Sequence, residues 1–197
     1  MNLTVISFYT PDWDYPKYAA QLKIDCSKLG IDYHIVEKTS TNSYVGNCQM
    51  KAFFIKECLE RFKSPVLWID ADASLTKSPD LLLDKSIQKF DIAGNRPANS
   101  PHRVHVGSIW FNYTDLVKQF VDEWCAEIEN KKPLDDAAFN GVWDLMKDEI
   151  NFFALPPEYF YILRTPDDTI FPDDTVIVHR LSCSELKMSY KNSIEKR

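Results

Sequence analysis

A chain of 197 residues in which 45% of the side chains are apolar and 13% aromatic can build one domain around a substantial core. Its net charge of −6 excludes a protein whose whole surface binds nucleic acid, although not a local basic groove. The N-terminus lacks a basic region followed by a long apolar core, and no apolar run is long enough to span a bilayer. We therefore expect a soluble, unexported protein without a membrane span.

The cysteines are odd in number, and no two of them form a C-x-x-C pair. They are Cys26, Cys48, Cys58, Cys125 and Cys183. Three of them fall within helical patterns. This usage is typical of free, buried thiols in a reducing compartment, and it predicts a cytoplasmic protein.

The N-terminal segments predict a strand, a helix and a second strand. Residues 3–8 are apolar and β-branched, and they break into a polar, aromatic loop over residues 9–16. A helical pattern then begins at Pro16 and stops at Gly30, before a second strand over residues 31–36. The short loops between these elements predict that the two strands are parallel and that the helix connects them by a right-handed crossover.

A polar loop over residues 38–47 leads into the second helix. Asn47 is the predicted N-cap of this helix, and Lys51 then falls in its first turn. The dipole of a helix attracts anions at that end, so Lys51 is either an anion ligand or a solvated helix lysine.

Two aspartates follow the most apolar strand of the chain. Residues 65–69 (PVLWI) are continuously apolar, as in a strand that is buried on both faces, and Asp70-Ala71-Asp72 follows at once. In an extended backbone, residues two apart point to the same side, so both carboxylates should project together. Two such oxygen donors suit Mg²⁺ or Mn²⁺ bridging to phosphate, whereas the alternative is a solvated acidic turn.

The middle of the chain predicts a loop between two strands. The strands are expected over residues 90–93 and 106–112, and the irregular segment over residues 94–103 carries positive charge. This segment is typical of a mobile loop over a site. Gly107 has no side chain and would let a ligand approach the backbone.

Two helices and several short strands complete the pattern. Residues 114–130 form an amphipathic helix, and a second helix opens at Asp135-Asp136, where acids complement the helix dipole. Late strands are expected over residues 152–155, 159–163 and 175–180. The last of them contains His179, which is either structural or a metal ligand.

In this order the segments resemble the GT-A glycosyltransferases, which move a sugar from a nucleotide diphosphate donor to an acceptor. The resemblance covers nearly the whole chain and is carried by VISFYTPD, LWIDADASL, VGSIWFN, DDAAFN and VIVHR. It implies an α/β fold of the GT-A, Rossmann-like type, with a mixed, mostly parallel sheet flanked by helices. It also implies one domain over residues 1–197, with a nucleotide-binding half (1–95) and a sugar and acceptor half (96–197).

The resemblance assigns residues to the donor. It places the loop after the first strand near the base and ribose, the start of the second helix near the nucleotide or its diphosphate, and the VGSIWFN strand near the transferred sugar. The donor-binding residues implied in this way are Tyr9, Thr10, Tyr44, Asn47, Lys51, Asp70, Ala71, Gly107, Ser108 and Asp135.

It also implies a metal site and a catalytic carboxylate. Asp70 and Asp72 would hold Mn²⁺ or Mg²⁺ on the diphosphate, and VIVHR resembles the family 8 strand whose histidine completes that site, here His179. DDAAFN is similar to the helix start of retaining members such as the family 8 galactosyltransferases and the blood-group transferases. In that register Asp136 takes the position of a carboxylate suspected of nucleophilic or electrostatic duty.

The predicted partners follow from this resemblance. They are a nucleotide-diphospho-sugar donor, with a UDP-sugar expected, and an unidentified acceptor that is a glycan, a protein or a modified nucleobase. The chain departs from family 8 after His179, because Arg180-Leu181-Ser182 stands where that family continues with Gly and Lys-Pro-Trp. It is also short for this fold, so a second subunit of a homo-oligomer or a large acceptor would complete the site.

Two other functional classes stay open. WIDADASLT also matches the D-x-D-x-T strand of haloacid-dehalogenase-like, Mg²⁺-dependent phosphatases, although Ala73 stands where that motif has glycine and two strands precede it. A non-catalytic module that binds a metal or a carbohydrate could use the same acids. However, DADASLTKSPDL lacks the glycine and the terminal glutamate of an EF-hand loop.

Overall fold

The computed structural model of the protein describes residues 3–98, 100–163 and 169–180. Within these residues the chain forms a six-stranded sheet of order β2-β1-β3-β6-β5-β7 and a three-stranded sheet of order β4-β9-β8. The strands of the large sheet are β1 (Thr4–Tyr9), β2 (Asp32–Glu37), β3 (Val66–Ile69), β5 (Ile92–Gly94), β6 (Ser108–Phe111) and β7 (Phe152–Ala154). The strand β6 is antiparallel to both of its neighbours, and the other pairs are parallel. This confirms the predicted mixed, mostly parallel sheet.

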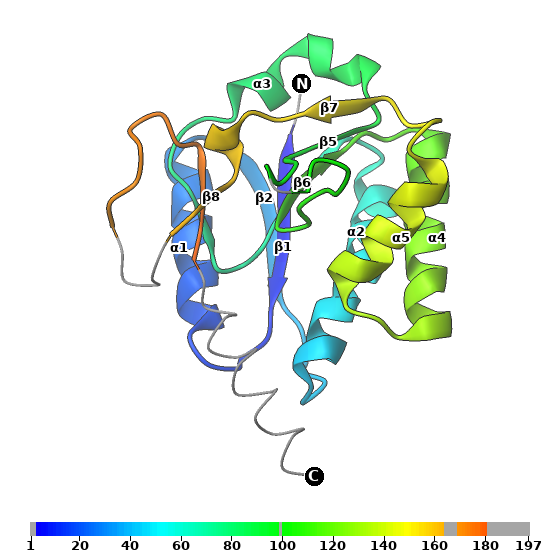
Figure 1. Ribbon diagram of the computed structural model, residues 1–197. Coiled ribbons are helices and arrows are strands. Elements are labelled where there is room, and N and C mark those ends of the chain that lie inside the picture. Colours follow the sequence, from blue (N-terminus) through cyan, green and yellow to red (C-terminus); the bar gives the residue numbers. More distant parts are fainter. Residues whose placement is uncertain (1–2, 99, 164–168, 181–197) are drawn as a thin grey trace.

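Helices cover both faces of the large sheet. The long helices are α1 (Tyr15–Lys28), α2 (Tyr44–Phe62), α4 (Asp115–Lys131) and α5 (Asp135–Met146). Figure 1 shows α1 on one side of the sheet and α2, α4 and α5 on the other. Shorter helical segments are α3 (Asp80–Leu83) and the 3₁₀ turns η1 (Lys85–Lys89) and η2 (Pro157–Tyr159).

The apolar run of β3 is explained by its place between these layers. All four of its residues are buried. Val66 and Trp68 belong to the core beneath α2, α4 and α5, whereas Leu67 and Ile69 belong to the core beneath α1. Because side chains alternate along a strand, a strand covered on both faces must be apolar at every position. The end of β3 is thereby fixed at the centre of the molecule.

The small sheet brings the end of the described chain beside the end of β3. It consists of β4 (Ala73–Leu75), β8 (Tyr161–Ile162) and β9 (Ile177–His179). The strands β4 and β9 are antiparallel, with Ala73 opposite His179. The sequence did not predict β4, because its three residues are extended only through pairing with a distant segment.

The second helix begins earlier than the sequence predicts. Its N-cap is Ser43, whose hydroxyl accepts a hydrogen bond from the backbone N–H of Gly46. The prediction of Asn47 as the N-cap is therefore wrong, and Lys51 lies one turn further into α2 than expected. Its placement in the first turn is wrong for the same reason.

The cysteines and the membrane prediction can be compared with the structure directly. Cys26, Cys48, Cys58 and Cys125 are free thiols, and Cys183 lies outside the described residues. Within the described ranges, no helix combines the length and the apolar character that crossing a bilayer requires.

Candidate active site

A cavity of about 540 Å³ opens where β1 and β3 end. Its walls also come from the start of α2, the loop before β6, the start of α5, and the β8 and β9 strands. The size suits a small-molecule ligand, and the ends of parallel strands are the usual place for one. The sequence-predicted residues that line it are Tyr9, Thr10, Tyr44, Asn47, Lys51, Asp70, Ala71, Asp72, Gly107, Asp135, Asp136 and His179. Ser108 does not line the cavity and lies buried behind it.

Asp70 and Asp72 occupy a tight turn rather than a strand. The strand β3 ends at Ile69, and the backbone N–H of Ala73 donates to the carbonyl of Asp70 at 2.9 Å. The prediction that strand alternation aligns the two carboxylates is therefore wrong. The turn leads directly into β4, which pairs with β9, and both aspartates line the cavity from the turn.

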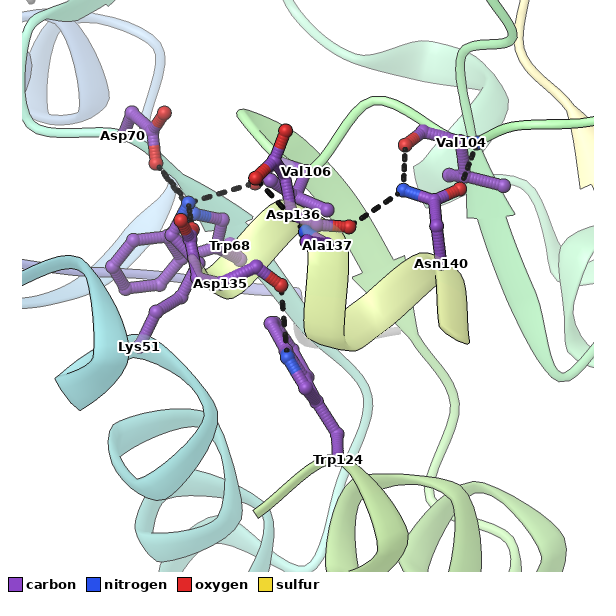
Figure 2. Close-up of polar contacts among 10 residues, drawn as sticks. All are labelled: Lys51, Trp68, Asp70, Val104, Val106, Trp124, Asp135, Asp136, Ala137 and Asn140. Carbon is purple, nitrogen blue, oxygen red and sulfur yellow. Dashed lines mark hydrogen bonds and ion pairs between the residues drawn. The ribbon is translucent and has the colours of Figure 1, made fainter. Parts of the chain in front are cut away.

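Lys51 joins this turn to the start of α5. Its Nζ lies 2.6 Å from Asp135 Oδ2, 2.9 Å from Asp70 Oδ1 and 3.2 Å from the carbonyl oxygen of Val106. Figure 2 shows the three acceptors converging on the ammonium group beside the Trp68 ring. Lys51 is only 6% exposed, and an ammonium group has three protons to donate. All of them are directed at protein oxygens, so Lys51 links two acids of the site in this structure.

Charge pairing decides the protonation of Lys51. Burial alone would lower the pKa of its ammonium group, but the carboxylates of Asp135 and Asp70 outweigh this effect and raise the pKa above its ordinary value. Lys51 is therefore a permanent cation between the two acids. Asp70 is fixed further by Trp68, whose ring N–H donates to Oδ1 at 2.9 Å.

The two aspartates at the start of α5 have different surroundings. Asp135 is buried, bonded to Lys51, and held by Trp124, whose ring N–H donates to its backbone carbonyl at 3.1 Å. Asp136 is half-buried, and its Oδ1 accepts a hydrogen bond from the N–H of Ala137. Among the described residues no cation pairs with Asp136. Of the two carboxylates at the start of α5, that of Asp136 is therefore the one that can interact with a ligand without first leaving a lysine.

The imidazole of His179 lies behind the turn. It is 6% exposed, and its Nε2 lies 3.3 Å from the hydroxyl of Ser108. Burial is the main reason why the pKa of His179 is lowered to about 3, and the positive charge of Lys51 and the proximity of His105 contribute to the same shift. His179 is therefore neutral at physiological pH, which is the form that ligates a metal.

Phe160 lies between two histidines. Its ring centroid is 4.2 Å from that of His179 and 4.2 Å from that of His105, and its plane is nearly parallel to the His105 ring. Burial, with Arg103 nearby, lowers the pKa of His105, so the stack has no charge. Sequence reasoning missed this stack, whose one signal is the general richness of residues 152–163 in aromatic side chains.

Gly107 fits into a space that no side chain could share. A Cβ at this position would lie 2.9 Å from His179 Cε1, 3.0 Å from Phe160 Cε2 and 3.2 Å from Asp70 Oδ2. The backbone N–H of Asp70 also donates to the Gly107 carbonyl at 2.8 Å. The absence of a side chain thus lets Asp70 and His179 approach one another around the backbone.

The loop before β6 is hydrogen-bonded to α5, and this differs from the predicted mobile loop. The side-chain amide of Asn140 on α5 accepts from Val104 N at 2.8 Å and donates to Val104 O at 3.1 Å. It also donates to the carbonyl of Asp136, as Figure 2 shows. The ring N–H of Trp143 donates to the carbonyl of His102 at 3.1 Å. Sequence reasoning missed Asn140, although it ends the DDAAFN segment.

The other end of the cavity is aromatic. Tyr9 and Thr10 line it where β1 ends, and Trp13 lies at the rim with 62% of its surface exposed and a left-handed φ of +49°. The side chain of Asn47 binds Thr41 N at 2.8 Å and Asp12 Oδ2 at 3.2 Å, so it ties two loops to α2. Sequence reasoning missed Trp13, whose signal is an aromatic residue placed between aspartates and prolines in a loop.

The donor types at the turn fit a divalent cation such as Mn²⁺ or Mg²⁺. Asp70 Oδ1 accepts hydrogen bonds from Lys51 and Trp68. Asp70 Oδ2 and the ring of His179 both lie next to Gly107. Carboxylate oxygens and a neutral imidazole are suitable ligands. As the described side chains stand, no three His, Cys, Asp or Glu converge tightly enough to hold an ion. A cation held by all three residues would require these side chains to move closer together.

Solved glycosyltransferases share this fold. A glycosyltransferase involved in the glycosylation of the major capsid of PBCV-1 matches with a TM-score of 0.71 and 15% identity, over 98% of this chain and 100% of that chain. The bifunctional glycosyltransferase WbbM matches with a TM-score of 0.63 and 13% identity, over 90% of this chain and 45% of that one. The galactosyltransferase LgtC, in complex with donor and acceptor sugar analogues, matches with a TM-score of 0.57 and 10% identity, over 90% and 86%.

These likenesses concern three-dimensional structure. Neither a protein-family model nor a curated protein sequence matches this chain. At identities of 10–15% the match shows the fold alone. The chain has the fold of the GT-A glycosyltransferases, and the fold predicted from the sequence is confirmed.

Proposed function

We propose that this protein is a metal-dependent glycosyltransferase that takes its sugar from a nucleotide diphosphate. The observation that carries the proposal is a single cavity, in a fold shared with glycosyltransferases, that is lined by Asp70, Asp72, His179 and Asp136. The first three supply metal-ligand chemistry, and Asp136 supplies a carboxylate without a cation partner among the described residues. A UDP-sugar is the expected donor.

The charge of the cavity supports a metal requirement. Its described lining holds four carboxylates, of Asp70, Asp72, Asp135 and Asp136. Three cations oppose them, namely Lys51, Arg103 and Arg180, and His179 is neutral. A diphosphate would therefore meet a wall with net negative charge. A divalent cation reverses that sign and stabilises the charge that develops on the leaving group.

The proposed reaction exchanges one C–O bond for another. The bond between the sugar C1 and the diphosphate oxygen breaks, and both electrons stay on that oxygen. The acceptor hydroxyl oxygen forms the new bond to C1, and its proton passes to the departing diphosphate. Asp136 would stabilise the positive charge that C1 acquires between these two events, which is compatible with retention of configuration.

The acceptor is proposed to be a glycan. The LgtC structure contains an acceptor sugar analogue, and the PBCV-1 enzyme is involved in glycosylation of a capsid protein. These descriptions favour a carbohydrate, free or protein-linked, over a modified nucleobase. In the described site, no observation favours the phosphatase interpretation, since Asp70 is bonded to Lys51 and Trp68 rather than presented as a nucleophile.

Thermal unfolding with nucleotides tests the proposal. Wild type and Asp72→Asn would be melted with UDP, GDP, CDP or ADP, each with and without Mn²⁺. A ligand at one hundred times its Kd stabilises by about 2.7 kcal/mol, which raises the Tm of a domain of this size by roughly 5–10 °C. We expect this rise for one nucleotide, only with Mn²⁺, and only in wild type. No shift with any of the four would contradict the proposal.

A binding module would pass that test, so turnover provides the second measurement. With the nucleotide identified, its sugar conjugates would be incubated with Mn²⁺ and a glycan acceptor array. Sugar transfer that is lost in Asp136→Ala, while nucleotide binding is kept, is the result expected of an enzyme. Donor binding without transfer to any acceptor or to water would favour the binding module.

A further inference from the structure

The cavity contains more acids than cations, and its best-placed lysine is already engaged. Lys51 directs its protons at Asp135, Asp70 and the carbonyl of Val106. It is therefore poorly placed to bind the phosphates of a donor without first releasing an acid. The anion of a nucleotide diphosphate needs another cation, and the described lining offers Arg103 and Arg180.

These two arginines differ in how firmly they are held. Arg103 is exposed on the loop before β6, and no partner of its guanidinium is present in the described part of the chain. Arg180 is half-buried, its Nη1 donates to the hydroxyl of Ser74, and its guanidinium lies 5.8 Å from the centre of the Tyr18 ring. Arg180 is thus oriented before any ligand arrives, which reduces the entropy lost when a ligand binds.

Arg180 is also attached to both segments that carry the candidate metal ligands. It follows His179 directly, and its backbone N–H lies 3.3 Å from the carbonyl oxygen of Asp72. Within the described residues Ser74 is the only acceptor for its guanidinium, which has five N–H donors. The remaining donors form a planar fork of the kind that binds two phosphate oxygens at once.

From this arrangement we propose that Arg180 binds the diphosphate of the donor. It would act beside the metal and take the role that the sequence had assigned to Lys51. The inference rests on the proposed function, since it needs a diphosphate ligand in this cavity. Lys51 then acts as a positioning residue for Asp70 and Asp135, and Arg180 touches the leaving group.

Calorimetric titration of nucleotides separates these roles. Wild type, Arg180→Met, Arg180→Lys and the matched control Arg103→Met would be titrated, with Mg²⁺ present, with UDP, GDP, CDP and ADP and with the corresponding nucleosides. We expect Arg180→Met to weaken binding of the preferred diphosphate about 10- to 100-fold and to leave nucleoside binding within twofold. Arg180→Lys should recover part of this loss, because it keeps the charge without the fork. Arg103→Met should stay within threefold of wild type.

The outcomes distinguish this inference from the proposed function. If wild type binds none of the four diphosphates, both the proposed function and the assignment of Arg180 are contradicted. If wild type binds one of them and Arg180→Met binds it within threefold, only the assignment of Arg180 is overturned. An equal loss of nucleoside and diphosphate binding would also overturn it, since that result means a collapsed cavity.

A second variant covers the case in which Arg180→Met does not fold. Ser74→Ala removes the hydroxyl that orients the guanidinium but keeps its charge. We expect this variant to bind the diphosphate several-fold more weakly, with an unchanged nucleoside affinity. Inorganic pyrophosphate with Mg²⁺ provides a probe without a base, and it should compete with the nucleotide in wild type. Unaltered diphosphate affinity in Ser74→Ala would contradict the proposed orientation of Arg180.

Discussion

The ammonium group of Lys51 lies 2.6 Å from the carboxylate of Asp135, although the two residues belong to different helices. The same ammonium group contacts Asp70, so one buried cation holds the end of β3 against the start of α5. The geometry of the whole acidic site therefore depends on a residue that need not touch the substrate.

Removing this cation should destabilise the fold strongly. In Lys51→Met the carboxylate of Asp135 stays buried without a counter-charge, and losing one partner of a buried pair costs about 3–5 kcal/mol. Urea denaturation measures this free energy. The matched control is Lys56→Met on the same helix, whose pair with Asp122 is exposed at 42% and 56% and should contribute less than about 1 kcal/mol. Equal losses in the two variants would show that the Lys51 network is not buried.

Gly107 should tolerate no side chain. In Gly107→Ala the new Cβ would collide with the ring of His179, and overpacking of this kind costs about 1–3 kcal/mol. Nucleotide binding with Mn²⁺ should weaken at the same time, because Asp70 and His179 would be pushed apart. Gly141→Ala in α5 is the control, since its nearest neighbour would be Glu127 Oε1 at 3.7 Å. Helix propensity predicts that this control gains about 0.5–1 kcal/mol. Wild-type affinity in Gly107→Ala would refute this reasoning.

Asn140 should control the loop before β6. Asn140→Ala leaves both the N–H and the carbonyl of Val104 without the partners they now have, at a cost of about 1–3 kcal/mol. The Val104 amide should then exchange with solvent deuterium much faster, as amide-resolved NMR would record. Asn140→Asp keeps an acceptor for Val104 N but loses the donor to Val104 O, so it should protect that amide partly. Identical exchange in all three proteins would mean that other contacts hold the loop.

Asp135 and Asp136 should have separable roles. Asp136→Ala should reduce kcat by about 10²–10³-fold and leave stability and donor affinity close to wild type, as expected of a group that stabilises charge in the transition state. Asp135→Ala should instead lower stability, because it removes a partner of Lys51. Steady-state kinetics and thermal unfolding of both variants measure the two effects. A stable Asp135→Ala variant with no turnover would reverse the assignment.

Local patterns were sufficient for most elements of the fold. All residues of β3 are apolar because both faces of the strand are covered, whereas α4 is apolar along one stripe because only one side of the helix is buried. The spacing of apolar residues in the sequence therefore predicts both elements. Local patterns do not identify the cap of α2, because Ser43 and Asn47 are both good N-cap residues and lie one turn apart. The structure decides between them, since the amide of Asn47 is used by Thr41 and Asp12.

The connections within the site were beyond sequence patterns. Lys51 on α2 contacts Asp70 after β3 and Asp135 at the start of α5, so these three segments must lie within hydrogen-bonding distance of one ammonium group. No spacing of residues in the sequence predicts such a contact. The pairing of Asn140 with Val104 and the stacking of Phe160 between His105 and His179 are likewise contacts between distant segments. Most of the site residues named from the sequence do line the cavity, but sequence reasoning misjudged what several of them contact.

The pairing of β4 with β9 has a consequence for the order of folding. The contact between Ser74 and Arg180 closes a separation of 106 positions along the chain, whereas the β1, α1 and β2 unit consists of neighbours in sequence. Contacts that close long loops lose more chain entropy and form late. On the ribosome, the N-terminal half can therefore collapse before His179 and Arg180 have emerged. The capacity to bind a donor would be acquired only after His179 and Arg180 have been synthesised and paired with the turn that follows β3.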